Sequence, residues 1–204
     1  MSAFTWPPES IAAAIERAAT AEQIQAAVLV ALFLAGEPAE LHVVLTRRRA
    51  DLRRHAGEIS FPGGRRDAED GELSITALRE AEEEIGLERD RVRLLGALPP
   101  TSTFATNYVI HPFVAAIPAG VAWRLSAREV DAVLELPIAA IRAGRTRTRL
   151  ERRGTTFEID AFAVDDNVIW GATARILEDL FEHLPDPAST LEGLRLPAIA
   201  REPD

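Results

Sequence analysis

The chain has 204 residues, 47% of them hydrophobic and 27% charged, a composition typical of a single globular domain with a well-buried core. Its formal net charge of −9 argues against non-specific nucleic-acid binding, which needs a basic surface, and the absence of cysteine excludes disulfides and thiol catalysis. The sequence has neither an apolar run of about 18 residues nor a signal-peptide pattern, so we expect a cytoplasmic protein without a membrane partner.

Composition and periodicity divide the sequence into three regions. We expect a lead with an amphipathic helix in residues 1–22, the main domain in residues 23–184 and a Pro-rich tail in residues 185–204. Residues 24–34 are predicted to form a buried strand, because the run is apolar and contains β-branched side chains. Residues 41–46 are predicted to return as a second strand after a turn, which gives a hairpin.

Basic side chains follow the second strand, in a stretch that contains Arg47, Arg48, Arg49, Arg53, Arg54 and His55. A guanidinium group has a planar fork of donors that matches phosphate oxygens, so such a stretch can hold an anionic substrate. We select Arg53 and His55 as substrate-binding candidates, because they lie between the second strand and the turn that follows. The alternative is a surface loop whose arginines pair with acidic side chains.

The turn Phe61-Pro62-Gly63-Gly64 leads toward a predicted helix. Its two glycines permit positive φ angles and a close approach of the backbone to a ligand, and a free carbonyl group there could complete a metal shell. Asp70 or Ser74 is predicted to cap the N-terminus of the helix, and Gly86 is predicted as the glycine that ends it.

This helix has an acidic face. At about 100° per residue, Glu80, Glu83 and Glu84 fall within about 100° of one another. The opposite face is predicted to be apolar and consists of Ile75, Leu78, Ala81 and Ile85. Like charges three and four residues apart destabilise a helix by about 0.2 to 0.5 kcal/mol per pair, and its C-terminal half disfavours anions.

A bound cation would offset this electrostatic cost. Mg²⁺ takes one or two protein carboxylates, keeps several waters and completes its shell with phosphate oxygens of a substrate. Arg79 lies one turn before Glu83 and is expected to hold that carboxylate in place. The alternative is an acidic helix face that is simply solvated.

The remainder of the main domain alternates predicted strands with two helices. We expect strands at residues 92–98, 108–117, 157–164 and 168–170, with a further strand inside 125–137. We expect helices at residues 137–144 and 173–184. Residues 145–153 form a second basic run, interpreted as an exposed hairpin. This pattern alone indicates an α/β or α+β fold.

The helix and its flanks resemble the Nudix hydrolase box. That pattern consists of Gly, five residues, Glu, seven residues and then Arg-Glu-apolar-x-Glu-Glu-x-Gly-apolar. Its second half is matched by Arg79, Glu80, Ala81, Glu83, Glu84, Gly86 and Leu87. In the first half, counting from Gly64 brings Asp70 to the acidic position, and eight residues separate it from Arg79.

The upstream segment is similar to the signature of coenzyme A pyrophosphatase-type Nudix proteins. The corresponding residues are Leu45, Thr46, Arg48, Ala50, Arg53, Gly57 and Phe61 to Gly64. The resemblance implies an α/β/α sandwich with a mixed β-sheet and a hydrolase that uses Mg²⁺ or Mn²⁺. The implied substrate is coenzyme A or an acyl or oxidised derivative, cleaved to phosphopantetheine and adenosine 3′,5′-bisphosphate. Phe61, Gly63 and Gly64 join Arg53 and His55 as predicted substrate contacts.

In the mechanism that follows, Glu80 and Glu84 bind a divalent cation, and Glu83 with a glycine carbonyl helps to hold it or a second ion. Water attacks one phosphorus of the diphosphate. Glu83, oriented by Arg79, is predicted to accept the proton, and Glu129 is the alternative base.

Two other functions compete with this prediction. A Nudix enzyme acting on NADH, ADP-ribose or a damaged nucleotide would carry the same box. A non-catalytic ligand-binding protein could keep the fold without turnover. The sequence leaves open whether the chain forms a homodimer.

Overall fold

The computed structural model describes residues 23–51, 57–103, 107–152 and 155–184. The predicted N-terminal helix and C-terminal tail lie outside the described residues, as do Arg53 and His55. None of the described helices is both long and apolar enough to cross a membrane.

The described chain is built around an eight-stranded mixed sheet. Its strands are β1 (Ile24–Ala35), β2 (Glu40–Arg48), β3 (Ile59–Ser60), β4 (Gly63–Arg65), β5 (Arg93–Ala97), β6 (Thr101–Ser102), β7 (Tyr108–Ala116) and β8 (Val130–Pro137). The central order is β3-β2-β1-β7-β5, while β4 pairs with β1, β6 with β7 and β8 with β2. Because β1 and β7 are parallel and the other pairs are antiparallel, the sheet is mixed, as predicted.

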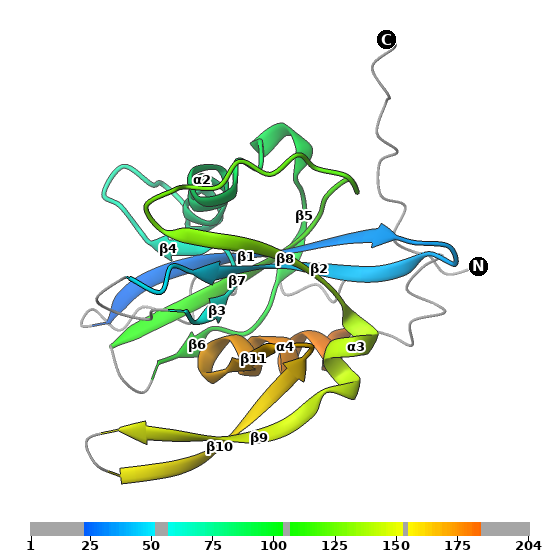
Figure 1. The fold of residues 1–204 in the computed structure, drawn as a ribbon. Coiled ribbons are helices and arrows are strands. Elements are labelled where there is room, and N and C mark those ends of the chain that lie inside the picture. Colours follow the sequence, from blue (N-terminus) through cyan, green and yellow to red (C-terminus); the bar gives the residue numbers. More distant parts are fainter. Residues whose placement is uncertain (1–22, 52–56, 104–106, 153–154, 185–204) are drawn as a thin grey trace.

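Strand β1 is apolar along most of its length because both of its faces are covered. Ala27, Leu29 and Ala31 face the cluster under helix α2 (Leu73–Ile85). Val28 and the alternate residues after it face a second cluster on the other side of the sheet, which packs against helices α3 (Ile138–Ala143) and α4 (Gly171–His183). Figure 1 shows helices on both sides of the sheet, which confirms the predicted sandwich.

The last strands form a separate three-stranded sheet, made of β9 (Arg145–Arg152), β10 (Thr155–Val164) and β11 (Asn167–Trp170). The basic run predicted as a hairpin is strand β9, and it pairs antiparallel with β10. On one face of this hairpin, Arg147 lies 3.3 Å from a carboxylate oxygen of Asp160. The sequence predicted strands at β10 and β11, but not their separation from the main sheet. Figure 1 shows β9 and β10 beneath α4, apart from that sheet.

Helix α2 differs from its prediction at its first turn. Its N-cap is Glu72, which makes no side-chain capping bond, so the prediction of Asp70 or Ser74 as the cap is wrong. Ile75, predicted on the apolar face, is 41% exposed. Gly86 ends the helix at φ 69°, which confirms the predicted glycine, because side chains rarely adopt this left-handed conformation. The short 3-10 helix η1 (Arg89–Arg91) follows.

Candidate active site

Glu84 is the most deeply placed of the three predicted carboxylates. Its side chain belongs to α2 but points back toward β4, where Oε2 accepts a hydrogen bond of 3.1 Å from the backbone N–H of Gly63. Its other oxygen, Oε1, lies 3.7 Å from Nη1 of Arg48. Burial raises the pKa of Glu84 to about 7, because the charged form loses its hydration.

Glu80 lies one turn earlier, directly against Gly64. A Cβ atom on Gly64 would stand 2.5 Å from the carboxyl carbon of Glu80, so the glycine is what allows the carboxylate to approach the strand. Burial raises the pKa of Glu80, and the neighbouring Arg79 guanidinium opposes that rise. The Phe-Pro-Gly-Gly turn therefore places its two glycines beside two different carboxylates of α2.

Arg79 is held by Asp70 beneath the first turn of α2. Its Nε donates to both Asp70 oxygens at 3.1 and 3.3 Å, and its Nη2 donates to Oδ2 at 2.9 Å. The hydrogen bonds from Arg79 hold the pKa of Asp70 far below its usual range. Asp70 thus anchors the box arginine, and the changed spacing before Arg79 does not prevent this contact.

The anchored guanidinium reaches two other acids with its Nη1 atom. This atom lies 2.9 Å from Oε1 of Glu80 and 3.1 Å from Oε2 of Glu83, so the predicted contact between Arg79 and Glu83 is present. The Glu83 side chain is 59% exposed, in contrast to Glu84. The acidic face therefore contains one buried, one half-buried and one exposed carboxylate.

A fourth acid faces this group from another element. Glu129 precedes β8, and its carbonyl oxygen accepts a hydrogen bond of 3.0 Å from the backbone N–H of Arg49. The charge of Glu129 raises the pKa values of both Glu80 and Glu84. Topology brings it to the site, because β8 pairs with β2 beside the end of that strand.

The donor set fits a hard divalent cation that keeps part of its shell in water and substrate. Within the described ranges, no three His, Asp or Glu side chains gather as a complete metal centre. However, Glu80 and Glu84 are two poorly hydrated carboxylates: the charge of Glu80 raises the pKa of Glu84, and the charge of Glu129 raises the pKa of both. Mg²⁺ usually takes one or two carboxylates, so this pair with phosphate and water oxygens suffices.

The remaining predicted substrate contacts fall in different places. Phe61 is 2% exposed and packs in the core cluster on the α4 side of the sheet. This placement in the core does not support a direct contact between its ring and a ligand. Arg53 and His55 lie outside the described residues, so their role stays a prediction.

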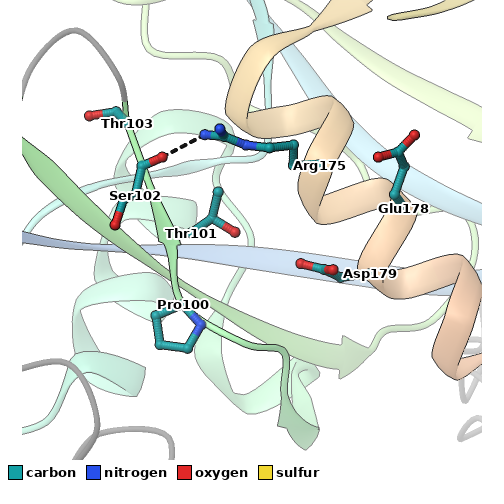
Figure 2. A pocket seen from close by; sticks show the side chains of 7 residues that line it. All are labelled: Pro100, Thr101, Ser102, Thr103, Arg175, Glu178 and Asp179. Carbon is teal, nitrogen blue, oxygen red and sulfur yellow. Dashed lines mark hydrogen bonds between the residues drawn. The ribbon is translucent and has the colours of Figure 1, made fainter. Parts of the chain in front are cut away.

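A hollow of about 410 Å³ lies between β6 and α4 (Figure 2). It is lined by Pro100, Thr101, Ser102, Thr103, Arg175, Glu178 and Asp179. Arg175 crosses it to donate a hydrogen bond to the Ser102 carbonyl oxygen. None of the predicted site residues lines this hollow.

The raised pKa of Glu84 predicts a pH-dependent stability difference in the metal-free protein. In the unfolded chain the group ionises near 4.5, and in the folded protein near 7. The protonated acid is therefore the form that folding favours, and stability is lost as the pH rises through this window. Between pH 4.5 and pH 7, the unfolding free energy of the wild type should therefore fall by up to about 3 kcal/mol more than that of Glu84→Gln.

Urea denaturation in EDTA, at a series of pH values from below 4.5 to above 7, measures this difference. Glu82→Gln is the matched control, because Glu82 is exposed on the same helix and pairs with Arg89. If the unfolding free energies of the wild type and Glu84→Gln changed in parallel with pH, Glu84 would ionise as freely in the folded protein as in the unfolded chain.

Comparison with known proteins identifies the class. The family model for the NUDIX domain matches residues 23–153. The chain therefore belongs to the Nudix family and is a Nudix hydrolase, a class that acts on nucleoside diphosphate derivatives and generally uses divalent metal ions.

The relatives are close enough to support this assignment over most of the chain. The Nudix hydrolases named NudL of Salmonella paratyphi B and Salmonella newport are each 39% identical over 163 residues, or 79% of this chain and 83% of theirs. The M. smegmatis Nudix hydrolase RenU shares the fold at 15% identity and a TM-score of 0.56, covering 88% of this chain and 91% of RenU. The NUDIX domain of Shewanella oneidensis NrtR, solved with ADP ribose, shares it at 16% identity and a TM-score of 0.53, covering 83% and 92%.

Proposed function

We propose that this Nudix hydrolase cleaves the diphosphate bond of coenzyme A, or of an acyl or oxidised derivative, to phosphopantetheine and adenosine 3′,5′-bisphosphate. The observation that carries the hydrolytic function is the seating of Glu80 and Glu84 against Gly64 and Gly63. The choice of substrate rests on the sequence signature from Leu45 to Gly64, which resembles that of coenzyme A pyrophosphatases.

Glu80 and Glu84 would hold the metal, Mg²⁺ or Mn²⁺, and Glu83 would assist them. When bound, the cation supplies positive charge that offsets the charge developing on the diphosphate oxygens. The chain prepares its ligands before the metal arrives. The Gly63 N–H fixes one oxygen of Glu84, and Arg79 fixes Glu80 from a position that Asp70 determines.

A carboxylate must accept the proton of the water that attacks phosphorus. As the new P–O bond forms, the bond to the bridging oxygen breaks, and the departing phosphate keeps the electron pair. We propose Glu83 as this base, because it is exposed to solvent and oriented by Nη1 of Arg79. Glu129 is the second candidate, because its charge acts on the two proposed metal ligands, Glu80 and Glu84.

A panel of diphosphates tests the proposal. Coenzyme A, acetyl-coenzyme A, coenzyme A disulfide, NADH and ADP-ribose are incubated with Mg²⁺ or Mn²⁺, and the products are separated by chromatography. We expect the highest kcat/KM for a member of the coenzyme A group, with adenosine 3′,5′-bisphosphate as a product. A tenfold preference for ADP-ribose or NADH would overturn the substrate assignment and leave the hydrolase class intact.

A further inference from the structure

Arg48 is fixed by its backbone beside the proposed metal site. It is the last residue of β2, where the register with β8 shifts between Arg47 and Arg48. Its N–H donates to the carbonyl oxygen of Glu58 at 3.0 Å, and its own carbonyl oxygen accepts from the N–H of Gly57 at 3.2 Å. Both polar groups of the Arg48 backbone are therefore bonded to the segment just before β3, which fixes the point from which the side chain extends.

The guanidinium of Arg48 is incompletely bonded. Its Nη1 lies 3.7 Å from Oε1 of Glu84, a distance of ionic attraction that is too long for a hydrogen bond. Its Nε is buried and has no hydrogen-bond partner among the described residues. A buried donor without an acceptor is unfavourable, so a ligand that supplies an acceptor stabilises this arrangement.

The two neighbouring arginines are bonded differently. Arg47 donates from Nη2 to the side-chain oxygen of Asn167. Arg49 donates from Nε and Nη2 to the carboxylate of Asp51, and from Nη1 to the carbonyl oxygen of Ala127. Of these three consecutive arginines, Arg48 is thus the one whose guanidinium can turn without breaking a hydrogen bond within the described structure.

We propose that Arg48 is a substrate-binding residue that donates to an oxygen of the substrate diphosphate from its position beside Glu84. This inference rests on the proposed function, because the acceptor is the diphosphate that the neighbouring carboxylates and their cation would hold. A guanidinium fork matches phosphate oxygens, and the diphosphate supplies the acceptor that the side chain lacks. Arg48 thereby joins Arg53 and His55, which the sequence suggested as substrate contacts and which lie outside the described residues.

The position of Arg48 predicts two effects of opposite sign. Without substrate, a cation at Glu84 and the guanidinium compete for the same carboxylate, so removing the guanidinium should strengthen metal binding. With substrate, the diphosphate attracts both the cation and the guanidinium, so removing the guanidinium should weaken diphosphate binding. If Arg48 only supported Glu84 structurally, its removal would weaken both metal binding and diphosphate binding. The opposite directions of the two effects are therefore diagnostic.

Two binding measurements on the full chain test this. Mn²⁺ binding to the free protein is followed by electron paramagnetic resonance. Binding of α,β-methylene ADP, whose P–C–P bridge resists hydrolysis, is followed by calorimetry at saturating Mg²⁺. For Arg48→Gln we expect Mn²⁺ affinity higher than that of the wild type and analogue affinity lower by about tenfold or more. Arg48→Lys keeps the charge but not the planar fork, so its affinity for the analogue should lie between those of the wild type and Arg48→Gln.

Arg49→Gln is the matched control, because it removes the same charge from an adjacent position whose guanidinium is paired with Asp51. Equal analogue affinity in Arg48→Gln and Arg49→Gln would overturn the proposal, as would parallel loss of Mn²⁺ and analogue binding in Arg48→Gln. A wild-type protein that binds no analogue and hydrolyses no diphosphate would instead contradict the proposed function itself. Thermal unfolding of Arg48→Gln and Arg48→Lys distinguishes lost binding from lost folding.

Discussion

Replacing Glu84 by glutamine is expected to lower kcat by about 100- to 1,000-fold while the protein stays folded. The amide cannot supply the anionic oxygen that a hard cation prefers, and the charge stabilisation provided by the cation is worth several kcal/mol. The fold should survive, because the glutamine side chain has the size of Glu84 and is buried without a charge, so it avoids the desolvation cost that raises the pKa of Glu84. Steady-state kinetics at saturating Mg²⁺, with circular dichroism of the same sample, measures both effects.

The helix provides its own control for this substitution. Glu82→Gln changes the same charge on an exposed side chain that pairs with Arg89, and it should leave kcat within about twofold. If Glu84→Gln retained wild-type turnover, Glu84 would not be a metal ligand in the active enzyme. If no variant, including the wild type, showed metal-dependent turnover, the chain would be a binding protein with this fold.

Replacing Asp70 by asparagine is expected to cause a loss of stability of about 3 to 5 kcal/mol. The carboxylate accepts hydrogen bonds from Arg79, from the Thr76 hydroxyl at 2.9 Å and from the backbone N–H of Asp67 at 3.1 Å. Its side chain is only 5% exposed, so the change leaves a half-buried guanidinium without its strongest partner. Urea denaturation at neutral pH measures the change in unfolding free energy.

The same contact has a pH signature. The folded-state pKa of Asp70 lies below its ordinary value of 3.8, so its stabilising contribution is complete above that pH and is lost as the pH falls further. Asp67→Asn is the control, because Asp67 is 60% exposed and lies 3.5 Å from Arg79. Equal stabilities of the two variants would show that the hydrogen bonds to Asp70 contribute no more than an exposed ion pair.

The strands and the acidic helix could be predicted from the sequence because each has a local pattern. The apolar run of β1 and the return of β2 gave the hairpin, and the periodicity of α2 placed Ala81 and Ile85 in the core. Helix positions alone also brought Glu80, Glu83 and Glu84 to one face. The match of consecutive residues to the Nudix box then supplied the family and the sandwich fold, which no periodicity could give.

The differences between the three glutamates could not be predicted in the same way. Residues at helical spacing are equivalent until tertiary neighbours are known, and it is β4 that buries Glu84 while Glu83 stays exposed. The role of Asp70 was hidden because its contact with Arg79 depends on the path of the loop, and the sequence signal had suggested a cap. Arg48 stood in a recognised signature, but only the unsatisfied geometry of its guanidinium distinguishes it from Arg47 and Arg49.

The most direct test of the central claim is a titration of the metal-free protein with Mn²⁺, followed by electron paramagnetic resonance, in the wild type and in Glu80→Gln and Glu84→Gln. If these two carboxylates hold the cation, each substitution should weaken Mn²⁺ binding by about tenfold or more, whereas Glu82→Gln should bind as the wild type does. Wild-type affinity in both Glu80→Gln and Glu84→Gln would contradict the account, because the metal would then lie elsewhere in the protein.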